Sequence, residues 1–153
     1  MSPEQMKYKL DEVLAAELLL IGRVTYESFA GAWPARTGEF ADKMNGMPKH
    51  VVSTTLKDPK WNNCTMIMAD VAGEVAKLKQ GSGGPILVAG SRMLVQTLLK
   101  HKLVDELRLM IFPVVLGSGR RLFPEMPDKM LLRLAGTQAF PSGVVVNSYV
   151  LAA

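Results

Sequence analysis

Apolar residues follow a helical spacing at the start of the chain and a strand-like run directly afterwards. Met6, Leu10 and Val13 recur every three or four positions, which predicts one apolar stripe on a helix. The segment Ser2–Gln5 supplies a capping box with proline at the first helical position, so the helix is expected to begin there. The four apolar residues Leu18–Ile21 then predict a short buried strand.

The same alternation of strand and helix continues over the first two thirds of the chain. Further strands are predicted at His50–Ser53, Thr65–Ala69 and Ile86–Ala89, the last of the fully apolar, buried parallel type. Helices are predicted near Thr25–Phe29, around Phe40–Met47, after an Asp70 cap and after Gly90.

The last third changes character, because three strands follow one another without helices between them. They are predicted at Asp105–Leu116, Leu131–Phe140 and Val144–Leu151, with Pro141–Gly143 as a tight turn. The sequence therefore predicts an α/β fold. Its mixed sheet has parallel strands first, an antiparallel C-terminal end, and helices on both faces.

Length and composition limit the class of protein. The 153 residues, 48% hydrophobic and 21% charged, suit one globular domain spanning residues 1–153. No apolar run is long enough to span a bilayer, and the N-terminus lacks the basic and apolar regions of a secretory signal. We therefore expect a cytoplasmic protein that is not bound to a membrane.

The rarer residues exclude several kinds of site. Cys64 is the single cysteine, and with His50 and His101 as the only histidines a structural zinc site is implausible, so no metal is expected. The net charge of +4 favours anionic ligands. The basic residues are scattered and only ten residues are aromatic, which argues against nucleic acid as the partner.

Candidate chemistry lies where the predicted parallel strands end, because ligands of open α/β sheets bind beyond those carboxyl ends. Three such ends combine glycine, hydroxyl or arginine residues suited to phosphate groups. Each also has an ordinary explanation as a strand–helix turn, a hydroxyl cap or a solvated arginine paired with Glu27. The candidate residues are Gly22, Arg23 and Thr25, then Ser53 and Thr54, then Gly90, Ser91 and Arg92.

The pattern of these residues bears on which nucleotide could bind. The G-x-G-x-x-G spacing and the following acidic residue of NAD-binding proteins are absent. Basic and hydroxyl groups stand where an acid would hold a free ribose 2′-hydroxyl. This favours a 2′-phosphate and hence NADP.

Four segments in register are similar to a known family. They are Ile21–Glu27, Val51–Thr55, Leu87–Ser91 and Val104–Leu109, and Pro113–Phe123 adds a glycine-rich, basic stretch. The sequence resembles the dihydrofolate-reductase-like superfamily, closest to the C-terminal reductase domain of the bifunctional riboflavin-biosynthesis deaminase–reductase. The resemblance implies the three-layer fold of that superfamily and an NADPH-dependent reductase of a small heterocyclic, pyrimidine- or pterin-like substrate.

The resemblance also implies roles for single residues. Arg23, Ser53 and Thr54 would hold the adenosine 2′-phosphate, and Gly22, Thr25, Gly90, Ser91 and Arg92 would line the pyrophosphate. No residue is assigned the catalytic role.

One departure from the family leaves a second function open. Relatives usually begin with a central strand and loop, and we expect about thirty of these positions to be missing from this chain, either as a truncation or as a natural short form. The alternative is therefore an NADPH-binding protein with little or no turnover. A nucleic-acid binder is a more distant alternative. Unpaired strand edges and apolar C-terminal strands lead us to expect a homodimer.

Overall fold

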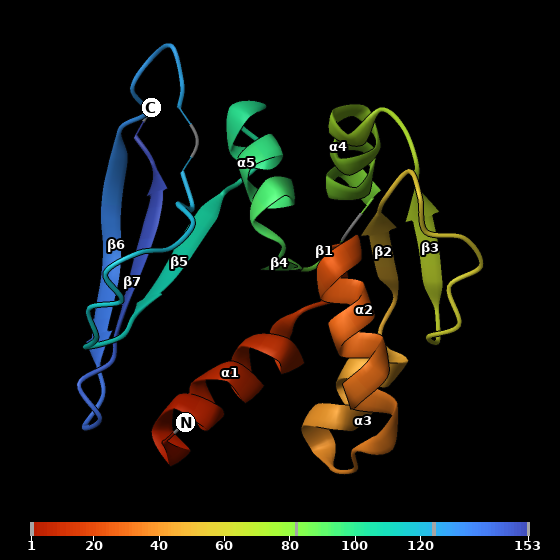
Figure 1. The fold of residues 1–153 in the computed structure, drawn as a ribbon, viewed down its shortest axis with the longest axis horizontal. Helices are drawn as coiled ribbons and strands as arrows, with labels where there is room; N and C mark the ends of the chain where they lie inside the picture. Colours follow the sequence, from red (N-terminus) through yellow and green to blue (C-terminus); the bar gives the residue numbers. More distant parts are fainter. Residues whose placement is uncertain (1, 82, 124, 153) are drawn as a thin grey trace.

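The computed structural model describes residues 2–81, 83–123 and 125–152 and contains two separate sheets (Figure 1). The first is parallel, with order β3-β2-β1-β4, and the second is antiparallel, with order β5-β7-β6. The prediction of a parallel part and an antiparallel C-terminal part is confirmed. Among the described residues, no strand of one sheet pairs with a strand of the other.

The elements follow the predicted alternation. The helices and strands of the parallel part are α1 (Pro3–Ala15), β1 (Leu18–Gly22), α2 (Arg23–Ala32), α3 (Glu39–Gly46), β2 (Lys49–Val52), β3 (Cys64–Ile67), α4 (Val71–Gly81), β4 (Ile86–Gly90) and α5 (Arg92–Lys100). The antiparallel strands are β5 (Glu106–Ile111), β6 (Leu132–Ala139) and β7 (Val145–Leu151). Among the described residues, no helix is long and apolar enough to cross a membrane.

Local sequence signals explain where several elements begin. The Ser2 hydroxyl accepts from the backbone N–H of Gln5, and the capping box at the start of α1 is complete. Asp70 caps α4 by accepting from the backbone N–H of Gly73. The predicted turn after β6 is present, with Gly143 at φ +91°, a conformation that favours glycine. Ser82, in the predicted turn before β4, lies outside the described residues.

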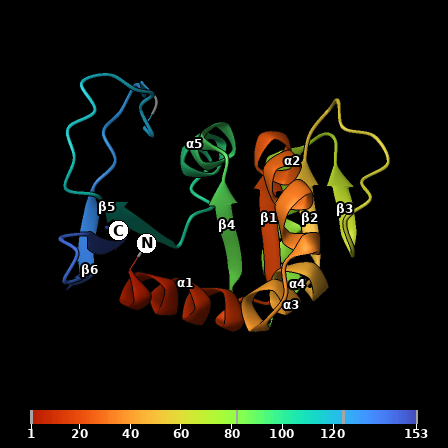
Figure 2. The same ribbon diagram turned by 60° about the horizontal axis from the view of Figure 1, so that its bottom comes forward.

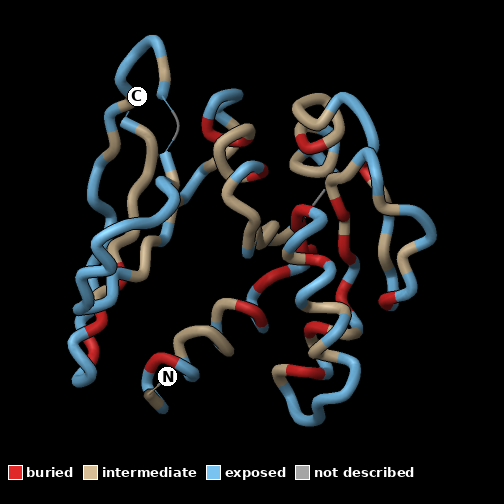
Figure 3. The backbone as a smooth tube through the Cα atoms, in the orientation of Figure 1, coloured by how far each residue is buried: buried red, intermediate tan, exposed pale blue. Residues whose placement is uncertain are grey.

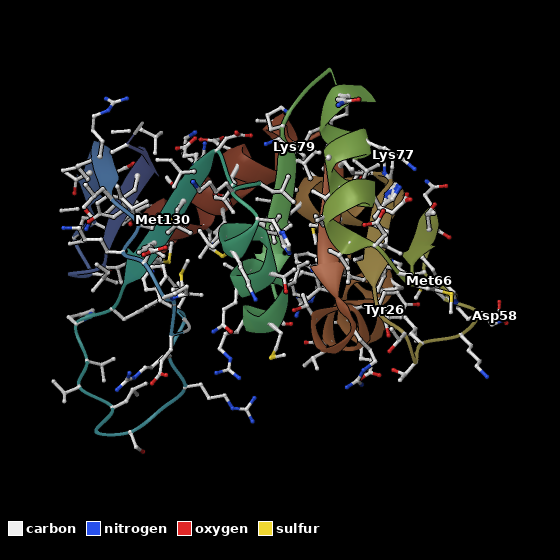
Figure 4. All side chains as sticks on the ribbon, turned by 90° about the horizontal axis from the view of Figure 1, so that it is seen from above. Tyr26, Asp58, Met66, Lys77, Lys79 and Met130 are labelled. Atoms are coloured by element: carbon white, nitrogen blue, oxygen red, sulfur yellow. The ribbon has the colours of Figure 1, made fainter. Side chains whose placement is uncertain are left out.

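Strand β1 forms the centre of the core, because its side chains point alternately to two apolar layers. Leu19 and Ile21 pack with residues of α2 and α3 on one face. Leu20 packs on the other face against Val75 of α4 and Leu94 of α5. Figure 2 shows the parallel strands side by side, with β4 at one edge of the sheet. In Figure 4, Met66 of β3 and Met130, which precedes β6, are labelled toward opposite sides of the molecule.

Two predicted strands differ from the structure. The side chains of β4 are mostly half-buried, and Ala89 is exposed, because β4 pairs only with β1 and forms a sheet edge in the described chain. β5 ends at Ile111 rather than at Leu116. Pro113 has no backbone N–H to donate to a neighbouring strand, which explains the early end.

A buried lysine joins the strand β2 to the loops around it. The Lys49 side chain is fully buried, and its Nζ donates to the backbone carbonyls of Asn45, Met47 and Asn62 at 2.8–2.9 Å. The ammonium also lies 4.3 Å from the centre of the Trp61 ring. Burial lowers the pKa of Lys49, but three carbonyl acceptors compensate its lost hydration.

Replacing Lys49 with methionine should destabilise the fold strongly. Three carbonyls would lose their donor, that of Met47 in a fully buried hydrogen bond, and one unpaired buried group alone costs about 1–3 kcal/mol. We expect the free energy of unfolding, measured in urea, to fall by about 3 kcal/mol or more. The exposed Lys57→Met variant is the control and should change it by less than about 0.5 kcal/mol. An equally small change for Lys49→Met would contradict this structural role.

Candidate functional site

Three parallel strands end around one cavity of about 390 Å³. In the sheet, β1 lies between β2 and β4, and all three strands are parallel, so their carboxyl ends meet at the same edge. This is the position at which ligands of open α/β sheets bind. The cavity is lined by Gly22, Arg23, Val24, Val52, Ser53, Thr54, Thr55, Val71, Ser91, Met93, Leu94 and Thr97.

Two glycines allow the ends of β1 and β4 to approach closely. A Cβ at Gly22 would lie 2.9 Å from the Ser91 hydroxyl oxygen, and one at Gly90 would lie 2.8 Å from Oγ1 of Thr25. Gly90 also has φ +138°, which side chains with a Cβ rarely adopt. The structure therefore brings the predicted residues Gly22, Thr25, Gly90 and Ser91 together. The Gly90–Ser91 peptide bond is cis.

Two helices begin at this junction with free first turns. Gly22 is the N-cap of α2 and Ser91 is the N-cap of α5. Neither cap makes a side-chain hydrogen bond to its helix. The first backbone N–H groups of both helices, and the positive ends of both helix dipoles, therefore suit an anionic ligand.

Arg23 lines the cavity and is held at the surface by an ion pair. Its Nη1 lies 2.9 Å from Oε1 of Glu27, one helical turn away. The two side chains are 43% and 53% exposed, so solvent screens the pair and its contribution to stability is small. The sequence left this ion pair open as an alternative to phosphate binding. Arg23 makes the pair with Glu27 and also lines the cavity, where it could reach a phosphate.

Ser53 and Thr54 also line the cavity, in the loop that follows β2. The Ser53 hydroxyl accepts from the backbone N–H groups of Thr55 and Leu56 at 3.1 and 3.0 Å, so it shapes a turn. The far end of this loop is fixed to α2, because the Tyr26 hydroxyl accepts from the N–H groups of Lys60 and Trp61. Tyr26 is thus a positioning residue for the loop.

Arg92 does not line the cavity. Its Nη1 donates to the backbone carbonyl of Arg121 at 3.5 Å, and Gln96 donates to the carbonyls of Arg121 and Leu122. α5 therefore holds the glycine-rich, basic segment that follows β5. Arg92 stands at the first position of α5, where its backbone N–H belongs to the free first turn.

The sequence did not indicate the apolar wall of the cavity. Val71 begins α4, and Met93, Leu94 and Thr97 come from the first turns of α5. Beside the phosphate-type groups they form a surface that could contact a flat ring. Leu94 also belongs to the core cluster.

The cavity lining contains one titratable side chain, Arg23. An arginine guanidinium stays charged in proteins, and the described lining holds no histidine, cysteine, aspartate, glutamate, lysine or tyrosine. Among the described residues, no group of histidine, cysteine or acidic residues is placed to hold a metal ion. The described arrangement suits binding and orienting an anion.

Comparison with known proteins identifies the family. The RibD C-terminal domain family matches residues 1–146. The chain belongs to this family. The uncharacterized protein YyaP of Bacillus subtilis (strain 168) is 32% identical to this chain over 138 residues, which are 87% of the chain and 73% of YyaP.

Solved structures confirm the fold that the resemblance implied. A putative riboflavin biosynthesis protein from Shewanella sp. PV-4 has a TM-score of 0.74 at 20% identity, covering 92% of this chain and 77% of that one. Dihydrofolate reductase from Enterococcus faecalis, complexed with NADP(H) and RAB-propyl, has a TM-score of 0.68 at 14% identity, covering 100% and 84%. The chain has the dihydrofolate-reductase-like fold, and its family indicates a reductase-type enzyme.

Proposed function

We propose that the chain is an NADPH-dependent reductase of a small heterocyclic, pyrimidine- or pterin-like substrate. The observation that supports the proposal most is the cavity at the ends of β1, β2 and β4, where two helices begin with free N–H groups beside Arg23. The pyrophosphate would lie against Gly22 and Ser91, which line the cavity, and close to Thr25 and Gly90, which pack against these two residues.

The 2′-phosphate would lie on the other side of the cavity. Arg23, Ser53 and Thr54 offer a guanidinium and two hydroxyls there. The adenine would contact the apolar wall formed by Val71 and Met93. When bound, NADPH would supply the hydride, and the residues of this chain would bind and orient it. The Enterococcus faecalis dihydrofolate reductase of similar fold is complexed with NADP(H), which supports this nucleotide.

A second candidate is a protein that binds NADPH without appreciable turnover. It is favoured by the absence of a proton donor or acceptor among the described lining residues. The separation of the two sheets beside β4 supports this second candidate too. In a continuous sheet, a neighbouring strand would form one more wall of the site near the end of β4.

Titration with NADPH followed by a turnover assay tests both candidates. We expect saturable binding, and oxidation of NADPH that depends on an added pyrimidine or pterin at about 1–10³ s⁻¹, the range typical of enzymes. Saturable binding without oxidation across the whole substrate panel would favour the second candidate. Absence of NADPH binding would contradict both.

A further inference from the structure

A loop between two strands carries one half of the proposed 2′-phosphate site. Residues 53–63 connect β2 to β3 and are called the β2–β3 loop below. Ser53 and Thr54, at the start of this loop, line the cavity. Arg23, the other half of the site, stands at the first position of α2. The two halves belong to different elements, so the distance between them depends on how the loop is held against α2.

The β2–β3 loop is fixed at its start and exposed in its middle. The Ser53 N–H donates to the carbonyl of Ile67 in β3 at 3.1 Å, and Leu56 packs against a core cluster. Lys57 and Asp58, which follow, are exposed. Figure 3 shows the loop mainly as exposed or intermediate, and Figure 4 labels Asp58 at one side of the molecule. Few buried contacts therefore hold the middle of the loop in one place.

Tyr26 of α2 holds the far end of the loop. Its Oη accepts from the backbone N–H groups of Lys60 and Trp61 at 3.0 and 3.3 Å. Among the described residues, these two hydrogen bonds are the ones that join α2 to the loop. Tyr26 is 6% exposed, and a hydrogen bond in such surroundings is stronger than one in water. Because Tyr26 stands three residues after Arg23, one helix carries both the guanidinium and the acceptor that holds the loop.

The end of the loop that Tyr26 contacts is itself fixed to the core. The Trp61 Nε1 donates to Oδ1 of Asn45 at 2.7 Å, and the Trp61 and Tyr26 rings lie 6.3 Å apart, centre to centre. Nδ2 of Asn45 donates in turn to the carbonyl of Trp33 at 3.0 Å. The Tyr26 hydroxyl therefore fixes α2 against a rigid base of the loop, and with it the spacing of the two halves of the site.

The ring and the hydroxyl of Tyr26 contribute in different ways. The ring belongs to a core cluster that also contains Leu19 and Ile21 of β1, and its burial stabilises the fold. The hydroxyl adds no apolar area to this cluster, but two N–H groups of the loop depend on it. Tyr26→Phe keeps the ring and removes the acceptor, so this substitution separates the two contributions.

We propose that the Tyr26 hydroxyl sets the preference for NADPH over NADH, because it holds Ser53 and Thr54 at the distance from Arg23 that a 2′-phosphate requires. This inference rests on the proposed function, since it places the nucleotide in the cavity. Tyr26 is a positioning residue, because it does not line the cavity and acts through the loop. NADH carries a free hydroxyl in place of the 2′-phosphate, so a misplaced loop affects the binding of NADPH and not that of NADH.

Titration of Tyr26→Phe with NADPH and with NADH tests the proposal. We expect NADPH affinity to fall about three- to tenfold, less than for loss of a whole charge-assisted contact, and NADH affinity to change by less than about twofold. The amides of residues 54–58 should exchange hydrogen faster than in the unmodified chain, because the loop has lost an anchor. Circular dichroism should show a folded variant, because the ring stays in the core.

Tyr8→Phe is the matched control, because it removes the hydroxyl of a tyrosine outside the site. Tyr8 lies in α1, and its ring packs edge-on against Phe140 with 6.0 Å between the ring centres. It does not line the cavity. Tyr8→Phe should leave the affinities for both nucleotides and the exchange of the loop amides unchanged.

A double-mutant cycle shows whether Tyr26 acts through the loop. Thr54→Val removes a loop hydroxyl that would contact the 2′-phosphate and keeps the shape of the side chain. Tyr26→Phe should weaken NADPH binding less in the Thr54→Val background than in the unmodified chain, because the contact that it misplaces is already lost. Additive effects of the two substitutions would contradict a route through the loop.

The outcomes separate this inference from the proposed function. If Tyr26→Phe weakened NADPH and NADH equally, or lowered stability without changing the preference between them, the hydroxyl would have a structural role alone. The inference would then be overturned while the proposed function stood. An unmodified chain that binds neither nucleotide would overturn both.

Discussion

Arg23→Ala should weaken NADPH binding about ten- to hundredfold and leave NADH binding almost unchanged. The 2′-phosphate is the group that distinguishes the two nucleotides, and loss of one charge-assisted contact costs about 1.5–3 kcal/mol. Arg23 is the one charged side chain among the residues that line the cavity. Fluorescence titration of both nucleotides with both proteins measures the effect.

Glu27→Gln is the matched control for this prediction. Glu27 pairs with Arg23, and an exposed pair one turn apart is worth about 0.3–0.5 kcal/mol. Releasing the guanidinium should therefore leave NADPH affinity unchanged or tighten it about twofold. Equal weakening of NADPH and NADH by Arg23→Ala would show that Arg23 does not recognise the 2′-phosphate.

Gly90→Val should reduce NADPH affinity at least tenfold and lower the stability of the fold. The new Cβ would stand 2.8 Å from Oγ1 of Thr25, in a backbone conformation at φ +138°. Such a conformation costs a residue with a Cβ about 1–3 kcal/mol, and relief of the clash must move the ends of β4 and α2 apart. Thermal unfolding and NADPH titration of the same preparation measure both effects.

Gly31→Ala controls for the general effect of replacing a glycine. Gly31 lies in α2, and a Cβ there would meet no atom within 4 Å. Alanine in an exposed helix should raise stability by about 0.5–1 kcal/mol and leave nucleotide binding unchanged. If Gly90→Val behaved like this control, the close approach of the two strand ends would not be needed for the site.

The parallel part of the fold could be predicted because each element has a local signal. Leu18–Ile21 is an uninterrupted apolar run ended by a glycine, and it forms the most buried strand, β1. The start of α2 was expected two residues too late, at Thr25, because its N-cap glycine provides no side-chain signal. The edge position of β4 could not be predicted, because pairing depends on distant segments and an apolar strand has the same sequence at an edge or a centre.

The polar side of the candidate site was easier to predict than its apolar side. Glycine, hydroxyl and arginine residues at strand ends have few structural reasons to occur together, so Gly22, Arg23 and Ser53 stand out. Val71 has the spacing of an ordinary core residue and Met93 is an exposed apolar residue, so only the packing of α4 and α5 shows that they line the cavity. The position of Arg92 also required the structure, because its partner lies 29 residues away.

Mapping of backbone-amide chemical shifts during NADPH titration tests the central claim most directly. The account places the nucleotide at the carboxyl ends of β1, β2 and β4. It therefore predicts saturable shifts at Gly22, Arg23, Ser53 and Ser91, with amides at the opposite ends of the strands unaffected. A second cavity, of about 320 Å³, lies at the amino ends of β1 and β2, where Leu18, Pro48 and Lys77 are among its lining residues. Shifts centred there would contradict the account, as would the absence of any shift.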